Sequence, residues 1–190
     1  MIGIALGLAA SNITEWWVHK HVLHAAKADG FWNFHLHEHH ANVLKNDGRD
    51  PAYDKPWWHT SPRRREVYGL VAITLPFMAL APVAPFFAGT VVYCSVDYYR
   101  KHKRAHVDPD WAREHLPWHV DHHMGPDQHA NWCVTRPWVD RIRGTRRKYV
   151  GTADEQKMLA RKALLRSKAP KATGIPLLPL GENVAGTPAG

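Results

Sequence analysis

The sequence predicts an all-α integral membrane protein with a short N-terminal membrane helix, a central transmembrane hairpin and a cytosolic histidine-rich helical cap. Three observations predict this class. The apolar residues of the 190-residue chain are concentrated in two stretches, although its mean hydropathy of −0.42 is slightly polar. Basic residues flank the longer stretch, and many of the 15 histidines stand in four clusters at helical spacing.

The first apolar stretch predicts a helix from Met1 to about His24. Glu15, Trp16 and Trp17 follow its apolar part and mark a membrane–water boundary, because tryptophan is enriched at the level of the lipid headgroups. The stretch has neither the basic start nor the cleavage site of a signal peptide. It is shorter than the roughly 20 residues of a full span. We therefore expect a helix that is truncated or that enters only one leaflet.

The second apolar stretch, Val67–Val96, predicts a membrane hairpin because it contains no charged residue. One straight helix of this length would measure about 45 Å, more than a bilayer core needs, and prolines such as Pro76 interrupt it. Basic residues precede the stretch at Arg63–Arg65 and follow it within Arg100–Arg104. Positive residues prefer the cytoplasmic side, so both ends should lie there, with a turn near Ala81–Pro85.

The chain divides into three predicted parts. Residues 1–150 form the membrane domain, which includes a histidine-dense helix at Phe31–Asn42 and a further helix around Trp111–His123. Residues 151–168 form a basic surface helix that begins with the capping box Thr152–Glu155 and lies either on anionic lipid or in solvent. Residues 169–190, rich in proline, glycine and alanine, form a disordered tail.

The charge and the cysteine content limit the class of protein further. A net charge of +8 suits nucleic acid, an anionic membrane face or a basic cytosolic rim. No nucleic-acid-binding motif is present and the basic residues flank apolar stretches, so we expect a bilayer and no nucleic acid as partner. Two cysteines, Cys94 and Cys133, are too few for a disulfide framework or a Cys-rich zinc site. The low cysteine content indicates a reducing compartment. Together with the basic residues that flank the hairpin, it predicts that the histidine clusters and the C-terminus lie on the cytosolic side.

The histidine clusters predict a site for two metal ions. Side chains three or four residues apart share one face of a helix, and neutral imidazole is the commonest metal ligand in proteins. Burying so many ionisable rings for packing alone would be costly. Two alternatives remain open, because His21 and His24, like His37 and His40, also stand three residues apart. In chain order, the four clusters are His19 and His24; His35, His39 and His40; His102 and His106; and His119, His122 and His123. Helical spacing predicts that the rings of His35 and His39 converge, as do those of His102 and His106 and those of the last cluster. These ten histidines are the expected ligands.

An all-histidine site brings no negative charge to two dications. Carboxylates nearby would offset the charge and orient the rings by accepting their free N–H groups. Glu15, Glu38 and Asp121 stand in or next to the clusters and are the candidates, with ordinary surface positions as the alternative. His115 and His129 are candidates for outer groups around the site.

The clusters resemble the histidine boxes of the fatty acid hydroxylase / sterol desaturase superfamily of integral-membrane di-metal enzymes. The first, second and last clusters match the family's HX3–4H, HX2–3HH and HX2–3HH boxes, and His102–His106 resembles an extra pair of the fatty acid 2-hydroxylase branch. Asn131–Thr135 and Pro137–Thr145 are similar to the family's trailing signature, with Cys133 where glycine is usual and Val139 inserted. The resemblance covers residues 15–145.

The resemblance implies two iron ions and the hydroxylation or desaturation of a lipid, such as a fatty acyl chain, with O2 as co-substrate. Ile4–Ile13 and the hairpin would line the substrate pocket, under a lid that includes Trp132 and Trp138. The chain has no haem-binding, Rossmann or iron–sulfur motif, so an external electron donor, either cytochrome b5-like or a ferredoxin, would dock on the basic rim. A carotenoid or sterol hydroxylase is the alternative within the family. A non-catalytic membrane protein is the alternative outside it, because histidine-rich sites bind zinc more tightly than ferrous iron.

Overall fold

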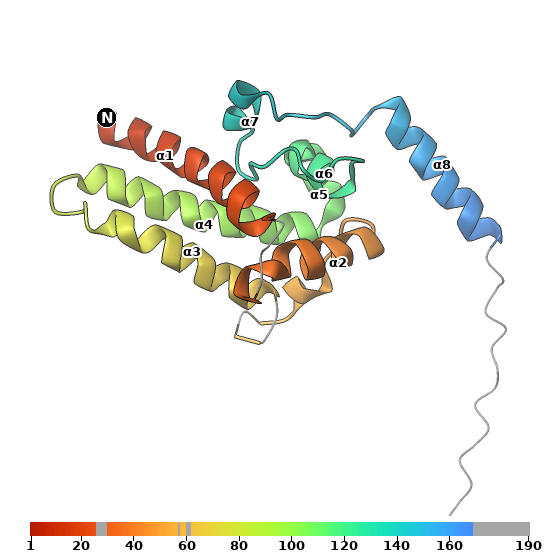
Figure 1. Ribbon diagram of the computed structural model, residues 1–190, viewed down its shortest axis with the longest axis horizontal. Coiled ribbons are helices and arrows are strands. Elements are labelled where there is room, and N and C mark those ends of the chain that lie inside the picture. Colours follow the sequence, from red (N-terminus) through yellow and green to blue (C-terminus); the bar gives the residue numbers. More distant parts are fainter. Residues whose placement is uncertain (26–29, 57, 60–61, 169–190) are drawn as a thin grey trace, which may run out of the picture.

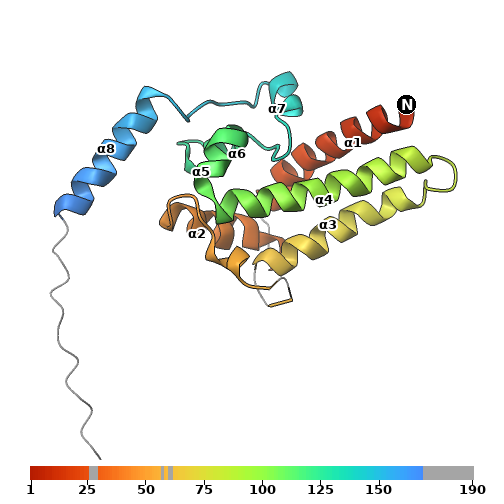
Figure 2. The ribbon, with the colours of Figure 1, turned by 180° about the vertical axis from the view of Figure 1, so that it is seen from behind.

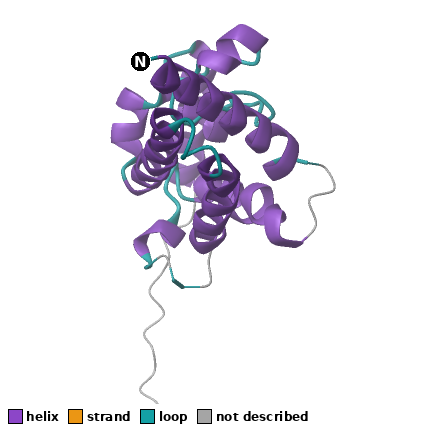
Figure 3. Cartoon of the chain, turned by 90° about the vertical axis from the view of Figure 1, so that its left-hand side faces the viewer, coloured by secondary structure: helices purple, strands orange, loops and turns teal. Residues whose placement is uncertain are grey.

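The computed structural model describes residues 1–25, 30–56, 58–59 and 62–168, and every regular element in these ranges is helical (Figures 1 and 3). The all-α prediction is therefore confirmed for this part of the chain, while the predicted tail at 169–190 lies outside it. The elements are α1 (Ile2–Val18), η1 (His19–Leu23), η2 (Gly30–Asn33), η3 (Phe34–His39), α2 (His40–Lys45), η4 (Pro51–Asp54), α3 (Pro62–Met78), α4 (Pro85–Val107), α5 (Pro109–His115), α6 (Pro117–Met124), α7 (Trp138–Arg143) and α8 (Ala153–Lys168).

The hairpin expected at Val67–Val96 is present as α3 and α4, but its membrane crossing is not supported. No helix among the described residues is both long enough and apolar enough to cross a bilayer. The apolar run is divided between two helices, and each has charged residues at the end next to the histidines, from Arg63–Glu66 in α3 and Asp97–Arg104 in α4. The predicted integral membrane fold, and the membrane location with cytosolic clusters that followed from it, are therefore wrong.

Helices α1, α3 and α4 lie side by side and form the long part of the molecule (Figure 2). Gly7 allows α1 to approach α4 closely, because a Cβ atom at this position would lie only 2.7 Å from Thr90 Cβ. The hydroxyl oxygens of Thr74 in α3 and Ser95 in α4 are 2.6 Å apart and join these two helices. This packing covers only part of the apolar surface of the three helices: Val91 and Cys94 are buried, whereas Ile2, Leu75 and Phe86 are 65–78% exposed.

The histidine-bearing cap covers one end of these helices and contains η3, α2, α5 and α6. The helix expected around Trp111–His123 is divided at Leu116, because Pro117 has no N–H group with which to continue the hydrogen bonds of α5. Proline is favoured at the first position of a helix, and Pro109 and Pro117 begin α5 and α6. The break turns α6 so that its histidines are buried in the cap.

Helix α8 extends from the cap and corresponds to the surface helix predicted at 151–168 (Figure 1). One half of the predicted capping box is present, since the Glu155 N–H donates to Thr152 Oγ1 at 3.4 Å. Glu155 Oε2 accepts from the Gly151 N–H at 2.8 Å, one residue before the expected donor, because the Thr152 N–H donates to the Tyr149 carbonyl. Glu155 also pairs with Arg113 of α5 at 2.7 Å, which ties the start of α8 to the cap.

Candidate metal centre

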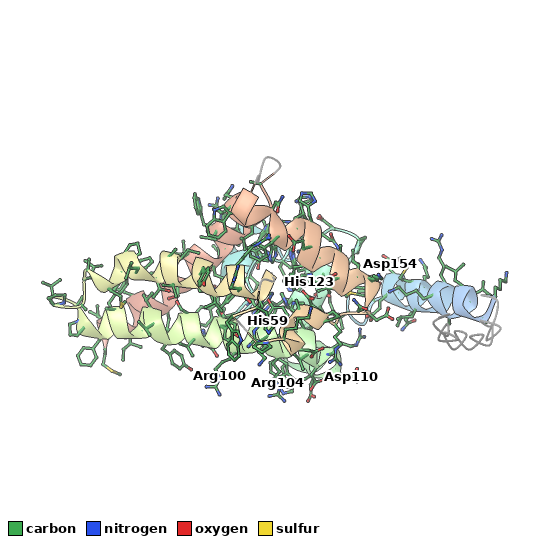
Figure 4. All side chains as sticks on the ribbon, turned by 90° about the horizontal axis from the view of Figure 1, so that it is seen from below. His59, Arg100, Arg104, Asp110, His123 and Asp154 are labelled. Atoms are coloured by element: carbon green, nitrogen blue, oxygen red, sulfur yellow. The ribbon has the colours of Figure 1, made fainter. Side chains whose placement is uncertain are left out.

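Nine of the ten predicted ligands form two buried clusters in the cap. The five-histidine site contains His19, His24, His35, His40 and His122, and the four-histidine site contains His39, His102, His106 and His123. Each histidine contributes one ring nitrogen to its site, and the nitrogens of one site all lie within 4.8 Å of one another. Each of these rings is at most 5% exposed. Figure 4 shows His123 inside the cap, whereas Arg100 and Arg104 lie at its rim. The two buried histidine clusters can each hold a metal ion.

The tenth predicted ligand, His119, lies beside the four-histidine site. Its Nε2 atom is 2.9 Å from Nε2 of His106, and its ring is 1% exposed. His119 is therefore a fifth ring next to the four-histidine site. It lies close to His106 but does not share the site with all four of its members.

Ring nitrogens approach one another at distances suited to a shared ion. The Nε2–Nε2 separation is 2.8 Å for His19 and His35, and 3.1 Å both for His24 and His40 and for His40 and His122. Two nitrogens bound at about 2.1 Å and at right angles around one ion lie about 3.0 Å apart, whereas tetrahedral ligands lie about 3.4 Å apart. The separations correspond to the smaller value.

Several inward-facing nitrogens of the four-histidine site have no protein partner. Nε2 of His39, of His102 and of His123 is buried and accepts or donates no hydrogen bond among the described residues. A buried polar atom without a partner destabilises a fold by about 1–3 kcal/mol. Three such atoms gathered in one place fit a bound cation, which would use these lone pairs.

The other nitrogen of each of five rings is fixed by a hydrogen bond. Nδ1 of His19 lies 2.6 Å from the Trp132 carbonyl oxygen, and Nδ1 of His122 lies 2.7 Å from that of Ala130. Because a carbonyl oxygen only accepts, Nδ1 carries the proton and Nε2 has a free lone pair. The other three rings belong to the four-histidine site. Nδ1 of His39 lies 2.7 Å from the Asp50 carboxylate, and Nδ1 of His102 lies 2.5 Å from that of Glu66. Nδ1 of His106 lies 3.1 Å from the Gly48 carbonyl oxygen.

Burial lowers the pKa values of nine of the clustered histidines, and neighbouring rings lower most of them further. The pKa falls from 6.5 to about 4 for His19 and to about 3 for His40. A charged imidazolium would lose its hydration in the cap and repel its neighbours. The rings are therefore neutral at pH 7, which is the form that binds metal.

Two π-helical turns determine which ring belongs to which site. The backbone N–H of His24 donates to the His19 carbonyl at 3.1 Å, and the N–H of His40 donates to that of His35. A residue and the fifth one after it thus share a face in η1 and η3. The convergence predicted for His35 and His39 is consequently wrong, because these rings belong to different sites.

The last histidine cluster is also divided between the two sites. His122 belongs to the five-histidine site, and His123 and His119 face the four-histidine site. Adjacent residues on α6 point about 100° apart, so one short helix between the two sites can supply both. His102 and His106, one turn apart on α4, belong to the same site as predicted.

Glu15 does not contact a histidine ring, contrary to its predicted role. Its carboxylate accepts hydrogen bonds from the backbone N–H groups of Val134 and Thr135 and, at 2.7 Å, from the Thr135 hydroxyl. Burial raises the pKa of Glu15, and these hydrogen bonds lower it again. Glu15 therefore fastens α1 to the loop whose carbonyl groups hold His19 and His122.

Two more predicted carboxylates also lie away from the rings. Glu38 is exposed and pairs with Arg65 at 2.8 Å. Asp121 is buried, pairs with Arg146 at 2.6 Å and accepts from the Tyr149 and Val150 N–H groups, so it anchors the segment before α8. Position next to a ligand in the sequence does not place a side chain next to it on a helix.

Four histidines named as alternative ligands or outer groups are exposed. His21 packs against Trp16 and Trp17 at the surface, and His37 is exposed on η3. His115 stacks on Trp111 outside the cap. His129 is exposed as well, although its ring lies 5.6 Å from that of His24.

The two predicted lid residues have different positions. Trp132 is 2% exposed and its ring packs against those of His19, His24 and His122 at 5.0–5.8 Å. Trp138 is 44% exposed and packs against Arg136. Trp132 thus shields the five-histidine site from solvent, and Trp138 does not cover either site.

Three residues at the site were missed. Asp50 and Glu66 are the carboxylates that contact ligand rings, and the Tyr53 hydroxyl donates to Glu66 at 2.7 Å. Asp50 precedes a proline and Glu66 follows three arginines, and neither position points to a histidine ring. No local pattern reveals these contacts, because the carboxylates lie 11 and 36 residues from His39 and His102.

A narrow apolar cavity leads from α1, α3 and α4 to the histidines. Its volume is about 90 Å³, and it ends at His19 and His35 of the five-histidine site and His102 of the four-histidine site. The apolar walls come from all three helices and include Leu8, Val18, Leu70, Ile73, Phe77 and Val91. The pocket expected between the first helix and the hairpin is thus present, although Ile4 and Ile13 do not line it and neither do Trp132 and Trp138.

No family model, curated protein or solved structure matches this chain. The resemblance to the fatty acid hydroxylase / sterol desaturase superfamily accordingly stays a prediction, as do the iron, the dioxygen and the partners that it implies.

Proposed function

We propose that this chain is a dinuclear iron oxygenase that hydroxylates or desaturates an unactivated C–H bond of a linear apolar substrate, such as a fatty acyl chain. One observation carries the proposal. The apolar cavity ends at rings from both histidine sites, so a carbon at its inner end would lie beside both ions. Binding sites for small molecules combine apolar walls with a few convergent polar groups in this way.

Iron ions in the two sites would supply the reductive activation of dioxygen, which removes hydrogen from carbon. The chain supplies the positioning and the environment. Leu70, Ile73 and Phe77 of α3 face the cavity together with residues of α1 and α4, and they hold a chain while excluding water. Trp132 closes the outer side of the five-histidine site.

The ligand arrangement favours iron over zinc. Zinc sites in proteins use four ligands in tetrahedral geometry, often with cysteine. One site here offers five imidazoles, and the Nε2 separations of 2.8–3.1 Å suit ligands at right angles. Iron accepts five or six ligands, so an iron ion could use all five imidazoles of this site, whereas a tetrahedral ion would use only part of the set.

The size of the cavity favours a chain over a fused ring system. Its volume is about 90 Å³, and residues of three helices line it. A flexible acyl chain can follow it, whereas the rigid rings of a sterol would displace the side chains that line it.

Electrons would come from a separate protein, because the sequence has no motif for a redox cofactor of its own. Arg100 and Arg104 are exposed at the rim of the cap, on either side of His102 in α4 (Figure 4). The acidic surface of a donor, either cytochrome b5-like or a ferredoxin, would be complementary to these arginines. It would bind where α4, the helix that contains His102, reaches the surface.

The proposal is tested by dioxygen uptake. Metal-free protein is loaded with Fe²⁺ without air and is given saturated fatty acids, a reduced ferredoxin and isotopically labelled O2. We expect labelled hydroxy acid, or alkene, in proportion to the dioxygen consumed. Loading with Zn²⁺ is the control. If iron-loaded protein consumes no dioxygen with any donor while both sites bind zinc, a non-catalytic zinc protein is the correct interpretation.

The cavity makes a second prediction, at Ile73. Ile73 lines the cavity, and Ile73→Phe adds a ring to its wall, so kcat/KM for long-chain substrates should fall about 10–200-fold, the usual effect of a pocket altered by a few carbons. Metal content should not change, because Ile73 contacts no ligand. Val71→Phe is the matched control, since Val71 is 58% exposed on the same helix. Equal kinetics for the two variants would show that substrate does not enter by this cavity.

A further inference from the structure

The two histidine sites differ in the groups that hydrogen-bond Nδ1, the ring nitrogen that points away from the site. In the four-histidine site, Nδ1 of His39 lies 2.7 Å from Asp50 Oδ2 and Nδ1 of His102 lies 2.5 Å from Glu66 Oε1. In the five-histidine site, the rings with a fixed Nδ1, His19 and His122, use only backbone carbonyl groups. Among the residues that the structure describes, no carboxylate contacts a ring of the five-histidine site.

The two carboxylates are held firmly in place. Asp50 is 0% exposed and accepts hydrogen bonds from the Ala52 N–H at 2.9 Å and the Asn42 side chain at 3.2 Å. Glu66 is 8% exposed and accepts from the Tyr53 hydroxyl at 2.7 Å. Charges that are buried and fixed in this way act strongly on a nearby ion, because little water screens them.

The carboxylates closest to the five-histidine site are already used elsewhere. Asp140 accepts from the Trp132 and Cys133 N–H groups at 2.9 and 2.8 Å, and Glu15 accepts from the loop that follows. Both therefore stabilise the backbone that surrounds the site and do not orient a ring. A dication in the five-histidine site keeps its full charge, whereas two carboxylates balance a dication in the four-histidine site.

We propose that the two sites bind metal with unequal affinity, the four-histidine site filling first and releasing its ion last, and that Asp50 and Glu66 are the positioning residues responsible. A carboxylate that accepts the outer N–H of a ligating histidine fixes the ring and increases its basicity. The five-histidine site has more rings but lacks this support. The protein thus passes through a form with a single ion. This inference rests on the proposed metal pair but not on oxygenase activity.

The test is a titration of metal-free protein with Co²⁺, whose visible absorption reports each ligand set, in competition with a chelator. We expect two steps with affinities at least about 10-fold apart. Asp50→Asn and Glu66→Gln should each weaken the tighter step about 10–100-fold and leave the weaker step unchanged. Asp54→Asn is the matched control, because Asp54 is exposed and pairs with Arg49 rather than with a ligand.

Variants of the ligands assign the steps to the sites. His102→Gln should remove the tighter step, and His122→Gln should remove the weaker one. A single step with two equal ions in the unmodified protein would overturn the proposal, as would a loss of the weaker step in Glu66→Gln. The outcome is independent of the proposed function. Two unequal binding steps without dioxygen uptake would support this inference and contradict the oxygenase. Two equal steps in an active enzyme would overturn this inference and leave the proposed function in place.

Discussion

His122→Ala is expected to lower the metal content from two ions to one and to reduce turnover more than about 100-fold, since loss of an outer partner alone already costs 10–100-fold. The His122 ring is fully buried, its Nε2 atom lies 3.1 Å from that of His40, and Nδ1 is fixed by the Ala130 carbonyl. Alanine removes one of five ligands and leaves a gap beside His40, whose Nε2 atom faces His122. Metal analysis and product formation measure the two effects.

The matched control is His115→Ala, which removes a histidine from the neighbouring helix α5. His115 is exposed and stacks on Trp111, so both metal ions and activity should be retained. His122→Gln keeps most of the side-chain volume and separates loss of the ligand from loss of packing. Full metal content and activity in both His122 variants would show that His122 is not a ligand.

Metal-free protein is expected to lose stability steeply as the pH falls below about 6.5. Burial, with neighbouring rings, lowers the folded-state pKa of nine histidines, whereas the unfolded chain titrates near 6.5. Between those values the unfolded state binds more protons, so the free energy of unfolding decreases as the pH decreases. Each ring contributes about 1.4 kcal/mol per pH unit.

Once the pH is well below 6.5, nine rings together contribute at most roughly 13 kcal/mol per pH unit, which is as large as the whole stability of a typical domain. Metal-free protein should therefore unfold cooperatively between about pH 6.5 and pH 5. Urea unfolding in the presence of EDTA, followed by circular dichroism at a series of pH values, measures this. A free energy of unfolding that is the same at pH 7 and pH 5 would contradict the burial of these rings in the folded state.

Helical spacing was enough to predict that the described part of the chain is all-α and that nine of the ten expected ligands gather in two buried clusters. The histidine clusters on α4 and α6 follow α-helical geometry, so the sequence could show that His102 and His106 share a site and that all clusters are rich in potential ligands. The sequence could not show that His35 and His40 belong to one site and His39 to the other. This division depends on a π-helical turn, in which residues five apart share a face.

The membrane prediction failed for a different reason. Composition alone does not show whether an apolar run crosses a bilayer. A turn divides the run at Val67–Val96 between α3 and α4, which also contain charged residues, and neither helix is both long and apolar enough to cross one. The carboxylates were missed because Asp50 and Glu66 reach His39 and His102 from 11 and 36 residues away. Contacts over such distances depend on tertiary packing and leave no local pattern.

The distribution of the ligands along the chain also affects how the protein is made. Neither site is complete until the ribosome has added His122 and His123, and the Trp132 and Ala130 carbonyls that orient two of the rings come later still. An ion held by either site would therefore be enclosed by its full set of rings only after this part of the chain has been made.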